Sequence, residues 1–192
     1  KPGLSAMVLK DGVDFDALDQ NVQAMEEKLP QDVGMMAVIK TNAYGHGAKA
    51  IAKHLEDNDR ISGYAVATAE EALELRKAGI GKMILILGYV FEKDYEDLIL
   101  QDIRFGIYRK DVAQALDAAA EKCHKKALIH IKIDTGMHRI GYPVCQESVE
   151  EIKEIAGLKH LCLEGIFTHF ARADEADKSY AKKAYSLFKD MI

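Results

Sequence analysis

Lys40 ends a short apolar run, Met35–Lys40, and a segment rich in glycine and polar side chains follows it. If the run is a buried strand, the lysine amine lies partly desolvated at its carboxyl end, where it can act as a nucleophile. Amines in this state form Schiff bases with carbonyl groups, including the aldehyde of pyridoxal phosphate. The alternative is a solvated lysine that only closes the strand.

Other side chains could serve a bound anion or a flat ring. Tyr44, in the segment after the lysine, could reach a phosphate group, and Gly45 and Gly47 allow the main chain to approach an anion closely. Arg139 is permanently charged and suits a phenolate or a carboxylate. His169 could stack on a ring or bind a metal, and a histidine satisfied within the core is the alternative.

A metal-dependent hydrolase is the rival interpretation. Its ligands would come from His138, Glu164, His169 and Asp174, but no HxH or HExxH pairing organises these residues. The sequence therefore predicts a site that holds no metal.

The chain that positions these residues alternates between two kinds of segment. Short apolar runs without polar alternation are typical of strands that are buried on both faces of a parallel sheet. We expect six such strands: Met35–Lys40, Tyr64–Thr68, Met83–Leu87, Arg104–Tyr108, Leu128–Asp134 and Leu163–His169. Helical spacing is found at Leu18–Leu29, in a segment that begins with a Thr68–Glu71 capping box and ends near Gly79, and at Lys110–Glu121, Gln146–Ala156 and Ala176–Ile192.

Alternating strands and helices indicate an α/β fold with a parallel sheet, either a doubly wound layer or a (β/α)8 TIM-type barrel. No G-x-G-x-x-G sequence follows any of these strands, which disfavours a dinucleotide-binding layer. A barrel has eight strands, so we interpret residues 1–192, with six βα units, as one domain that is the front part of a barrel cut at Ile192. In either architecture, ligands bind at the carboxyl ends of the strands, where Lys40, Arg139 and His169 are found.

Composition and charge argue against several other classes of protein. The net charge is -5 with a pI near 5.8, and without a basic block no nucleic-acid-binding surface is expected. The most apolar run, Met83–Leu87, is far shorter than the ~20 residues of a membrane helix. Residues 1–7 contain no hydrophobic stretch of signal-peptide length, and Cys123, Cys145 and Cys162 form no CxxC pair. We therefore expect a cytoplasmic protein with free thiols, with neither nucleic acid nor membrane as a partner.

Three segments resemble the hallmark motifs of the alanine racemase family of fold-type III pyridoxal-phosphate enzymes. Residues 37–47 (AVIKTNAYGHG) resemble the cofactor attachment motif, residues 132–141 (KIDTGMHRIG) the second motif, and residues 168–171 (THFA) with Asp174 the third. The first two motifs are long and specific. Pyridoxal-phosphate homeostasis proteins share the barrel and the lysine but lack the second motif, which, with Leu87–Tyr89, is also similar to the racemase domains of vancomycin-resistance serine racemases.

The resemblance implies a role for each candidate residue. Lys40 would hold pyridoxal 5'-phosphate covalently and act as one of two acid–base groups, and Tyr44 would hydrogen-bond the phosphate. Arg139 would contact the phenolic oxygen of the cofactor and the substrate carboxylate, and His169 would lie beside the pyridine ring. Lys132 matches a position that is carbamylated in some members, where it orients the arginine.

The resemblance also implies an amino-acid racemase, an isomerase that interconverts L-alanine and D-alanine for peptidoglycan synthesis in the bacterial cell wall and works as a homodimer. A serine or broad-specificity racemase and a non-catalytic pyridoxal-phosphate-binding homeostasis protein are the alternatives. In the family, the second base is a tyrosine of the partner's C-terminal β domain, which residues 1–192 would lack, so we expect this portion alone to be inactive. None of its eight tyrosines lies in a matching sequence context. If residues 1–192 alone did invert alanine, Tyr142, which follows the Arg139 loop, would be the first tyrosine to consider as the second base.

Overall fold

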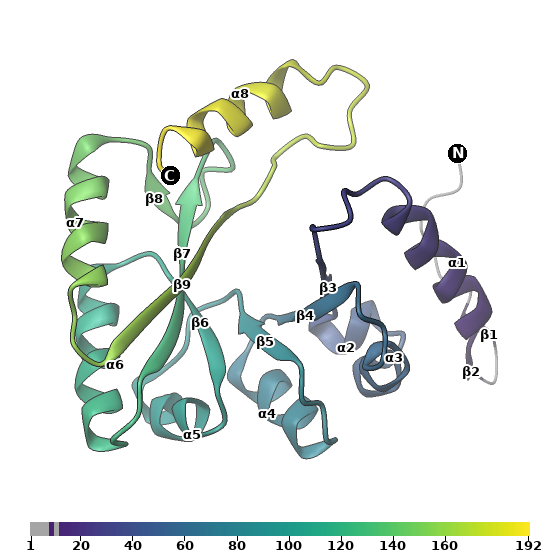
Figure 1. The fold of residues 1–192 in the computed structure, drawn as a ribbon, viewed down its shortest axis with the longest axis horizontal. Helices are drawn as coiled ribbons and strands as arrows, with labels where there is room; N and C mark the ends of the chain where they lie inside the picture. Colours follow the sequence, from purple (N-terminus) through teal and green to yellow (C-terminus); the bar gives the residue numbers. More distant parts are fainter. Residues whose placement is uncertain (1–7, 10–11) are drawn as a thin grey trace. The chain divides into compact units, whose positions relative to one another are not determined.

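The computed structural model describes residues 8–9 and 12–192, and the chain divides into two compact units, Lys1–Tyr89 and Val90–Ile192. Each unit contains three of the six expected strands (Figure 1). The expectation that residues 1–7 contain no signal-peptide stretch concerns residues outside the described ranges. Within those ranges, no helix is both long enough and apolar enough to cross a membrane.

The first unit is built on a three-stranded parallel sheet. Its elements in chain order are β1 (Val8–Leu9), β2 (Gly12–Val13), α1 (Phe15–Glu26), β3 (Met35–Val38), α2 (Lys40–Tyr44), α3 (Ala48–Leu55), β4 (Ile61–Val66), α4 (Ala69–Lys77) and β5 (Met83–Ile86). The two short strands β1 and β2 pair antiparallel with each other. β4 lies between β3 and β5, so that Tyr64 aligns with Ala37 on one side and with Ile84 on the other.

The second unit is built around a long central strand. Its elements are a short 3-10 helix η1 (Glu92–Asp94), α5 (Tyr95–Leu100), β6 (Ile103–Ile107), α6 (Lys110–Lys122), β7 (Ala127–Asp134), β8 (Tyr142–Pro143), α7 (Gln146–Ala156), β9 (Leu161–Thr168) and α8 (Ser179–Lys189). β7 pairs in parallel with β6, with β9 and, at its carboxyl end, with β8. Helices α6 and α7 lie side by side along β7 and β9 (Figure 1).

Strands β4, β5, β6 and β7 are mostly buried, which explains their continuous apolar sequences, whereas β3 and β9 are only partly buried. Burial of large side chains in both sheets removes apolar surface from water at about 25 cal/mol per Å² and dominates the stability of each unit. The side chains that are less than 2% exposed include Tyr64, Ile84, Ile86, Phe105, Ile107 and Ile129. The three cysteines are free thiols and are partly buried rather than fully buried.

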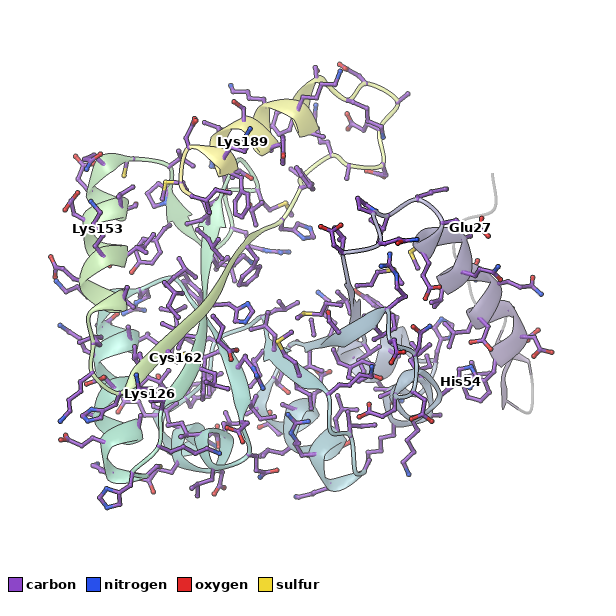
Figure 2. All side chains as sticks on the ribbon, viewed as in Figure 1. Glu27, His54, Lys126, Lys153, Cys162 and Lys189 are labelled. Carbon is purple, nitrogen blue, oxygen red and sulfur yellow. The ribbon has the colours of Figure 1, made fainter. Side chains whose placement is uncertain are left out.

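Side-chain contacts outside the sheet fix the helices of the first unit. The expected capping box begins α4, because the Thr68 hydroxyl accepts the Glu71 amide and the Glu71 carboxylate accepts the Thr68 amide. His54 of α3 reaches α1: its ring stacks on Phe15 at 4.4 Å, and its Nε2 lies 2.7 Å from Asp19 Oδ1 (Figure 2). These contacts hold α1 and α3 together beside the strand that leads to Lys40.

All six predicted parallel strands are present, although some of their bounds differ. β3 ends at Val38, two residues before Lys40, because the chain turns sharply there. β4 begins at Ile61, earlier than predicted, and its small residue Gly63 is required by close packing, since a Cβ there would lie 2.6 Å from the Met83 carbonyl oxygen. The short elements β1, β2, α2, α3, η1, α5 and β8 were not predicted, and α8 begins at Ser179 rather than at Ala176.

Candidate active site

Lys40 directly precedes an unusual turn of the main chain. Ile39 before it is buried, Lys40 itself is half-buried, and the next four residues, Thr41 to Tyr44, all have positive φ angles of 51–55°. Left-handed backbone costs roughly 1–2 kcal/mol per non-glycine residue, so this one turn carries considerable strain. Strained backbone of this kind persists only where the surrounding structure holds it, and it is found preferentially at functional sites.

Main-chain and side-chain hydrogen bonds hold the second half of the turn. The Ala43 amide donates to the Ile39 carbonyl at 2.8 Å, and the Gly47 amide donates to the Asn42 carbonyl at 2.9 Å. The Asn42 side chain adds a third bond, because its Oδ1 accepts the Ala48 amide at 2.9 Å at the start of α3. Asn42 therefore joins the turn to the helix that follows it.

Glu71 of α4 holds the first half of the turn. Its Oε1 accepts the amide of Thr41, the residue directly after Lys40. Its Oε2 accepts the amides of Ala67 at 2.7 Å and Thr68 at 3.3 Å, at the carboxyl end of β4. One carboxylate thus joins the lysine segment to the neighbouring strand end and helix.

Tyr44 ends the left-handed turn and is 62% exposed, so its hydroxyl is accessible to a ligand. Together with His46, it borders an apolar groove of about 810 Å³ that α1, β3 and α3 line. Within the described residues, the buried Nδ1 of His46 has no hydrogen-bond partner. The edge of this groove therefore offers polar atoms beside an apolar wall.

In the second unit, Asp134 organises the loop after β7. Its Oδ1 accepts the amides of Gly136 at 2.9 Å and His138 at 3.0 Å, and its Oδ2 accepts the Arg139 amide at 3.1 Å. Burial raises the pKa of the Asp134 carboxyl, but the three amides outweigh burial and hold that pKa below its usual value. Gly141 completes the loop at φ 139°, where a Cβ would lie 2.6 Å from the Asp134 nitrogen.

Lys132 lies on β7, and His169 directly follows the end of the adjacent strand β9. Lys132 is only 5% exposed, and its Nζ lies 5.8 Å from the ring centroid of Phe167, its register neighbour on β9. Thr168 fixes the end of β9, since its hydroxyl donates to the β7 main chain and also bonds the Thr135 hydroxyl at 2.8 Å. His169 follows directly and is exposed.

The structure thus places the predicted residues in two groups. Lys40 and Tyr44 belong to one turn after β3 in the first unit. Lys132, Arg139 and His169 lie near the carboxyl ends of β7 and β9 in the second unit, which parallel pairing puts at one edge of the sheet. The Arg139 side chain is exposed, on a loop whose main chain Asp134 fixes.

Tyr142, the tyrosine to consider first if residues 1–192 carried a second base, is engaged within the fold of the second unit. Its side chain is buried, and its hydroxyl donates to Glu151 Oε1 of α7 at 2.6 Å. Burial and this bond to a carboxylate raise the pKa of the Tyr142 phenol far above its usual value. The phenol joins β8 to α7 and keeps its proton.

The rival metal site is not assembled either. Among the residues that the structure describes, no three His, Cys, Asp or Glu side chains gather in a way that could hold a metal ion. Glu164, one of the candidate ligands, instead accepts from Arg104 Nε at 2.9 Å, and its Oε2 lies 3.7 Å from His130 Nε2. Burial lowers the pKa of the His130 imidazole, although Glu164 opposes this shift.

Two positioning carboxylates were missed from the sequence. Glu71 was recognised only as a helix cap, because its bond to Thr41 joins residues thirty positions apart. Asp134 was recognised only as part of a motif, although its three bonds are local and an aspartate side chain commonly accepts the amide two residues further on.

Comparison with known proteins shows the family to which the chain is similar. Residues 13–192 match the family described as Alanine racemase, N-terminal domain. An alanine racemase of Methanococcus maripaludis is 41% identical over 182 residues, which are 94% of this chain and 48% of that protein. The chain spans about half the length of the curated relatives that it matches.

Solved structures agree with the sequence match. The alanine racemase of Clostridium difficile 630 superposes with a TM-score of 0.89 at 42% identity, covering 92% of this chain and 46% of that chain. A structure of the same enzyme in complex with cycloserine superposes with the same TM-score and identity and is covered to 48%. The parallel strands and alternating helices are therefore about six βα units of a (β/α)8 TIM-type barrel, as predicted.

Proposed function

We propose that this chain, which belongs to the alanine racemase N-terminal domain family, forms the cofactor-binding barrel portion of a racemase that interconverts L-alanine and D-alanine. The observation that carries the proposal is Lys40 at the end of β3, half-buried and followed by a strained turn with two separate anchors. Such a turn is costly, and a lysine that only closes a strand would not need it. The D-alanine formed would serve bacterial peptidoglycan synthesis.

The residues present fit pyridoxal 5'-phosphate by their chemistry. They include a half-buried primary amine on Lys40, an exposed phenol on Tyr44, an exposed guanidinium on Arg139 and an exposed imidazole on His169. The amine can react with the aldehyde of the cofactor, and the phenol can hydrogen-bond its phosphate. The guanidinium can bind its phenolic oxygen, and the imidazole can lie beside its flat ring. When bound, the cofactor supplies an electron sink that stabilises the negative charge left on the α-carbon of an amino acid.

Each side chain has a distinct task in this proposal. Lys40 binds the cofactor covalently and moves a proton to or from the substrate α-carbon on one face. Tyr44 donates a hydrogen bond to the phosphate, and His169 lies beside the ring. Arg139 binds the phenolic oxygen of the cofactor and the carboxylate of the substrate, and Asp134 holds the main chain that carries it.

We also propose that Lys132 is carbamylated. Lys132 lies two residues before the end of β7 and Arg139 in the loop that follows, and two cations about 4 Å apart would repel each other by ~1 kcal/mol in water and by more when partly buried. Once the Lys132 ammonium has lost a proton, its neutral amine can add carbon dioxide and release a second proton, which would make one partner negative and create an oriented pair with the arginine. Intact-mass measurement under mild conditions should show the added carbon dioxide, and Lys132→Gln should remove it.

Inversion needs a base on the opposite face of the substrate, and Tyr142 does not supply it. We therefore propose that the second base comes from outside residues 1–192, in a cytoplasmic homodimer, and that this portion alone does not racemise. A serine or broad-specificity racemase and a non-catalytic cofactor carrier remain outcomes of the test.

The experiment measures enantiomer exchange of alanine and of serine in deuterated water. The protein expressed from its complete reading frame should racemise alanine faster than serine, whereas residues 1–192 alone should not invert either amino acid. Faster turnover of serine would replace the substrate assignment. Binding of the cofactor without any exchange would identify a carrier and contradict the racemase proposal.

A further inference from the structure

The amide of Thr41 is the first hydrogen-bond donor after Lys40, and its partner determines the direction in which the chain leaves the lysine. That partner is Glu71 Oε1, from the first turn of α4. The Thr41 hydroxyl in turn donates to the Lys40 carbonyl at 2.7 Å. The main chain on the carboxyl side of Lys40 is therefore attached to a helix that lies thirty residues further along the chain.

Both oxygens of Glu71 accept hydrogen bonds, each from a different segment of the chain. Oε1 receives the Thr41 amide, while Oε2 receives the amides of Ala67 and Thr68, where β4 ends and α4 begins. A carboxylate in the first turn of a helix is further stabilised by the helix dipole. The side chain is thus held from one end by α4 and presents its other oxygen to the lysine segment.

We propose that Glu71 is a positioning residue for Lys40, and that its bond to Thr41 keeps the lysine amine presented for covalent attachment of the cofactor. This inference rests on the proposed function of Lys40. Glu71 acts through the main chain and does not itself touch the reacting atoms. Its known part, the capping box of α4, is a separate role that uses the other oxygen.

The chemistry of the two oxygens provides a sharp substitution. Glutamine has one acceptor oxygen and one nitrogen that only donates. In Glu71→Gln, the side-chain NH2 group must therefore face either the amide of Thr41 or the amides of Ala67 and Thr68. These amides are donors and cannot accept a hydrogen bond from it. Loss of a hydrogen bond to a charged group, converted to a rate, corresponds to about 10- to 100-fold.

Two control variants separate positioning from simple loss of stability. Thr68→Ala removes the hydroxyl that accepts the Glu71 amide, so it weakens the same helix start without touching the Thr41 bond. Glu74→Gln removes a carboxylate from the same helix, where it pairs with Lys49 at 3.1 Å on the exposed surface. Neither control residue belongs to the proposed site.

The experiment uses the protein from its complete reading frame, prepared without cofactor. Hydrogen exchange of the peptide that contains residues 41–44 is measured first, together with the thermal unfolding midpoint. Pyridoxal phosphate is then added, and the rate of covalent attachment is followed by absorbance. We expect Glu71→Gln to speed exchange in residues 41–44 and to slow attachment by about 10- to 100-fold, whereas Thr68→Ala lowers the midpoint but changes neither rate.

Each other outcome has a defined meaning. Attachment at the wild-type rate in Glu71→Gln, or equal slowing in Thr68→Ala, would overturn the positioning role. Should Glu71→Gln fail to fold, Glu71→Asp keeps the charge but withdraws it by one methylene group, and slower attachment with it supports the proposal while an unchanged rate overturns it. If the wild-type protein attaches no cofactor, the proposed function fails, while the exchange comparison still tests the Glu71–Thr41 contact.

Discussion

In each unit, one carboxylate near a strand end accepts hydrogen bonds from three main-chain amides. The two carboxylates differ in how far away along the chain these amides lie. Asp134 accepts amides two, four and five residues further along its own loop. Glu71 accepts two amides from its own helix start and one from thirty residues earlier. The Arg139 loop is therefore organised locally, whereas the Lys40 turn depends on a contact that exists only after the first unit has folded.

The backbone of the two loops differs in the same way. The Lys40 turn places four consecutive non-glycine residues in left-handed conformation. The loop after β7 places glycine at two of its positive φ positions, Gly136 and Gly141, and only one other residue, His138. Strain is thus concentrated beside the proposed nucleophile, and we expect perturbations of the first unit to affect chemistry more than those of the second.

The largest effect is expected from removal of the Lys40 amine. Lys40→Ala should abolish measurable racemisation by the full-length protein, a loss of at least about 100-fold, because both covalent attachment and proton transfer on one face are lost. Arg139→Lys, in the second unit, should retain more activity because it keeps the positive charge. The assay is alanine racemisation without added amines, and near wild-type turnover in Lys40→Ala would show that the first unit does not carry the nucleophile.

A smaller effect, on stability, is expected from Asp134→Asn. Three main-chain amides donate to the two carboxylate oxygens of Asp134. Asparagine has only one acceptor oxygen, so at least one of these amides would face its NH2 group and lose its hydrogen bond. We expect the free energy of unfolding to fall by about 1–3 kcal/mol. Asp111→Asn, which removes an exposed carboxylate paired with Arg109, is the control and should change stability little.

The pH dependence of Asp134 sharpens this prediction. Because the pKa of the Asp134 carboxyl is lowered in the folded protein, the unfolded chain takes up the proton first as the pH falls below 3.8, the usual value for this group. The stability that the carboxylate contributes is therefore complete above that pH and is lost as the pH falls through the lower folded pKa. Urea unfolding at a series of acidic pH values should show this loss in the wild-type protein and a smaller one in Asp134→Asn.

The smallest effect is expected from Tyr142→Phe. The substitution removes one hydrogen bond, from the phenol to Glu151 of α7, and should lower the free energy of unfolding by about 1 kcal/mol. Racemisation should be unchanged, because the phenol is buried and keeps its proton. A strong loss of activity without loss of stability would restore Tyr142 as a candidate base.

Sequence reasoning succeeded where the signal is local. Continuous apolar runs predicted the six strands because a parallel sheet buries both faces, and Thr68 with Glu71 predicted the start of α4. The left-handed turn could not be predicted, since of Thr41–Tyr44 only Asn42 tolerates positive φ readily. The hydrogen bond of Tyr142 could not be predicted, because its partner Glu151 lies on α7, which reaches β8 only in the folded unit.

The most direct test of the central claim is to locate the attached cofactor. The full-length protein is loaded with pyridoxal phosphate, reduced with borohydride, digested and mapped by mass spectrometry. The account predicts one modified peptide, with the added mass on Lys40 at the strained turn after β3. The added mass on the buried Lys132 of the second unit, on any other lysine, or on none would contradict it.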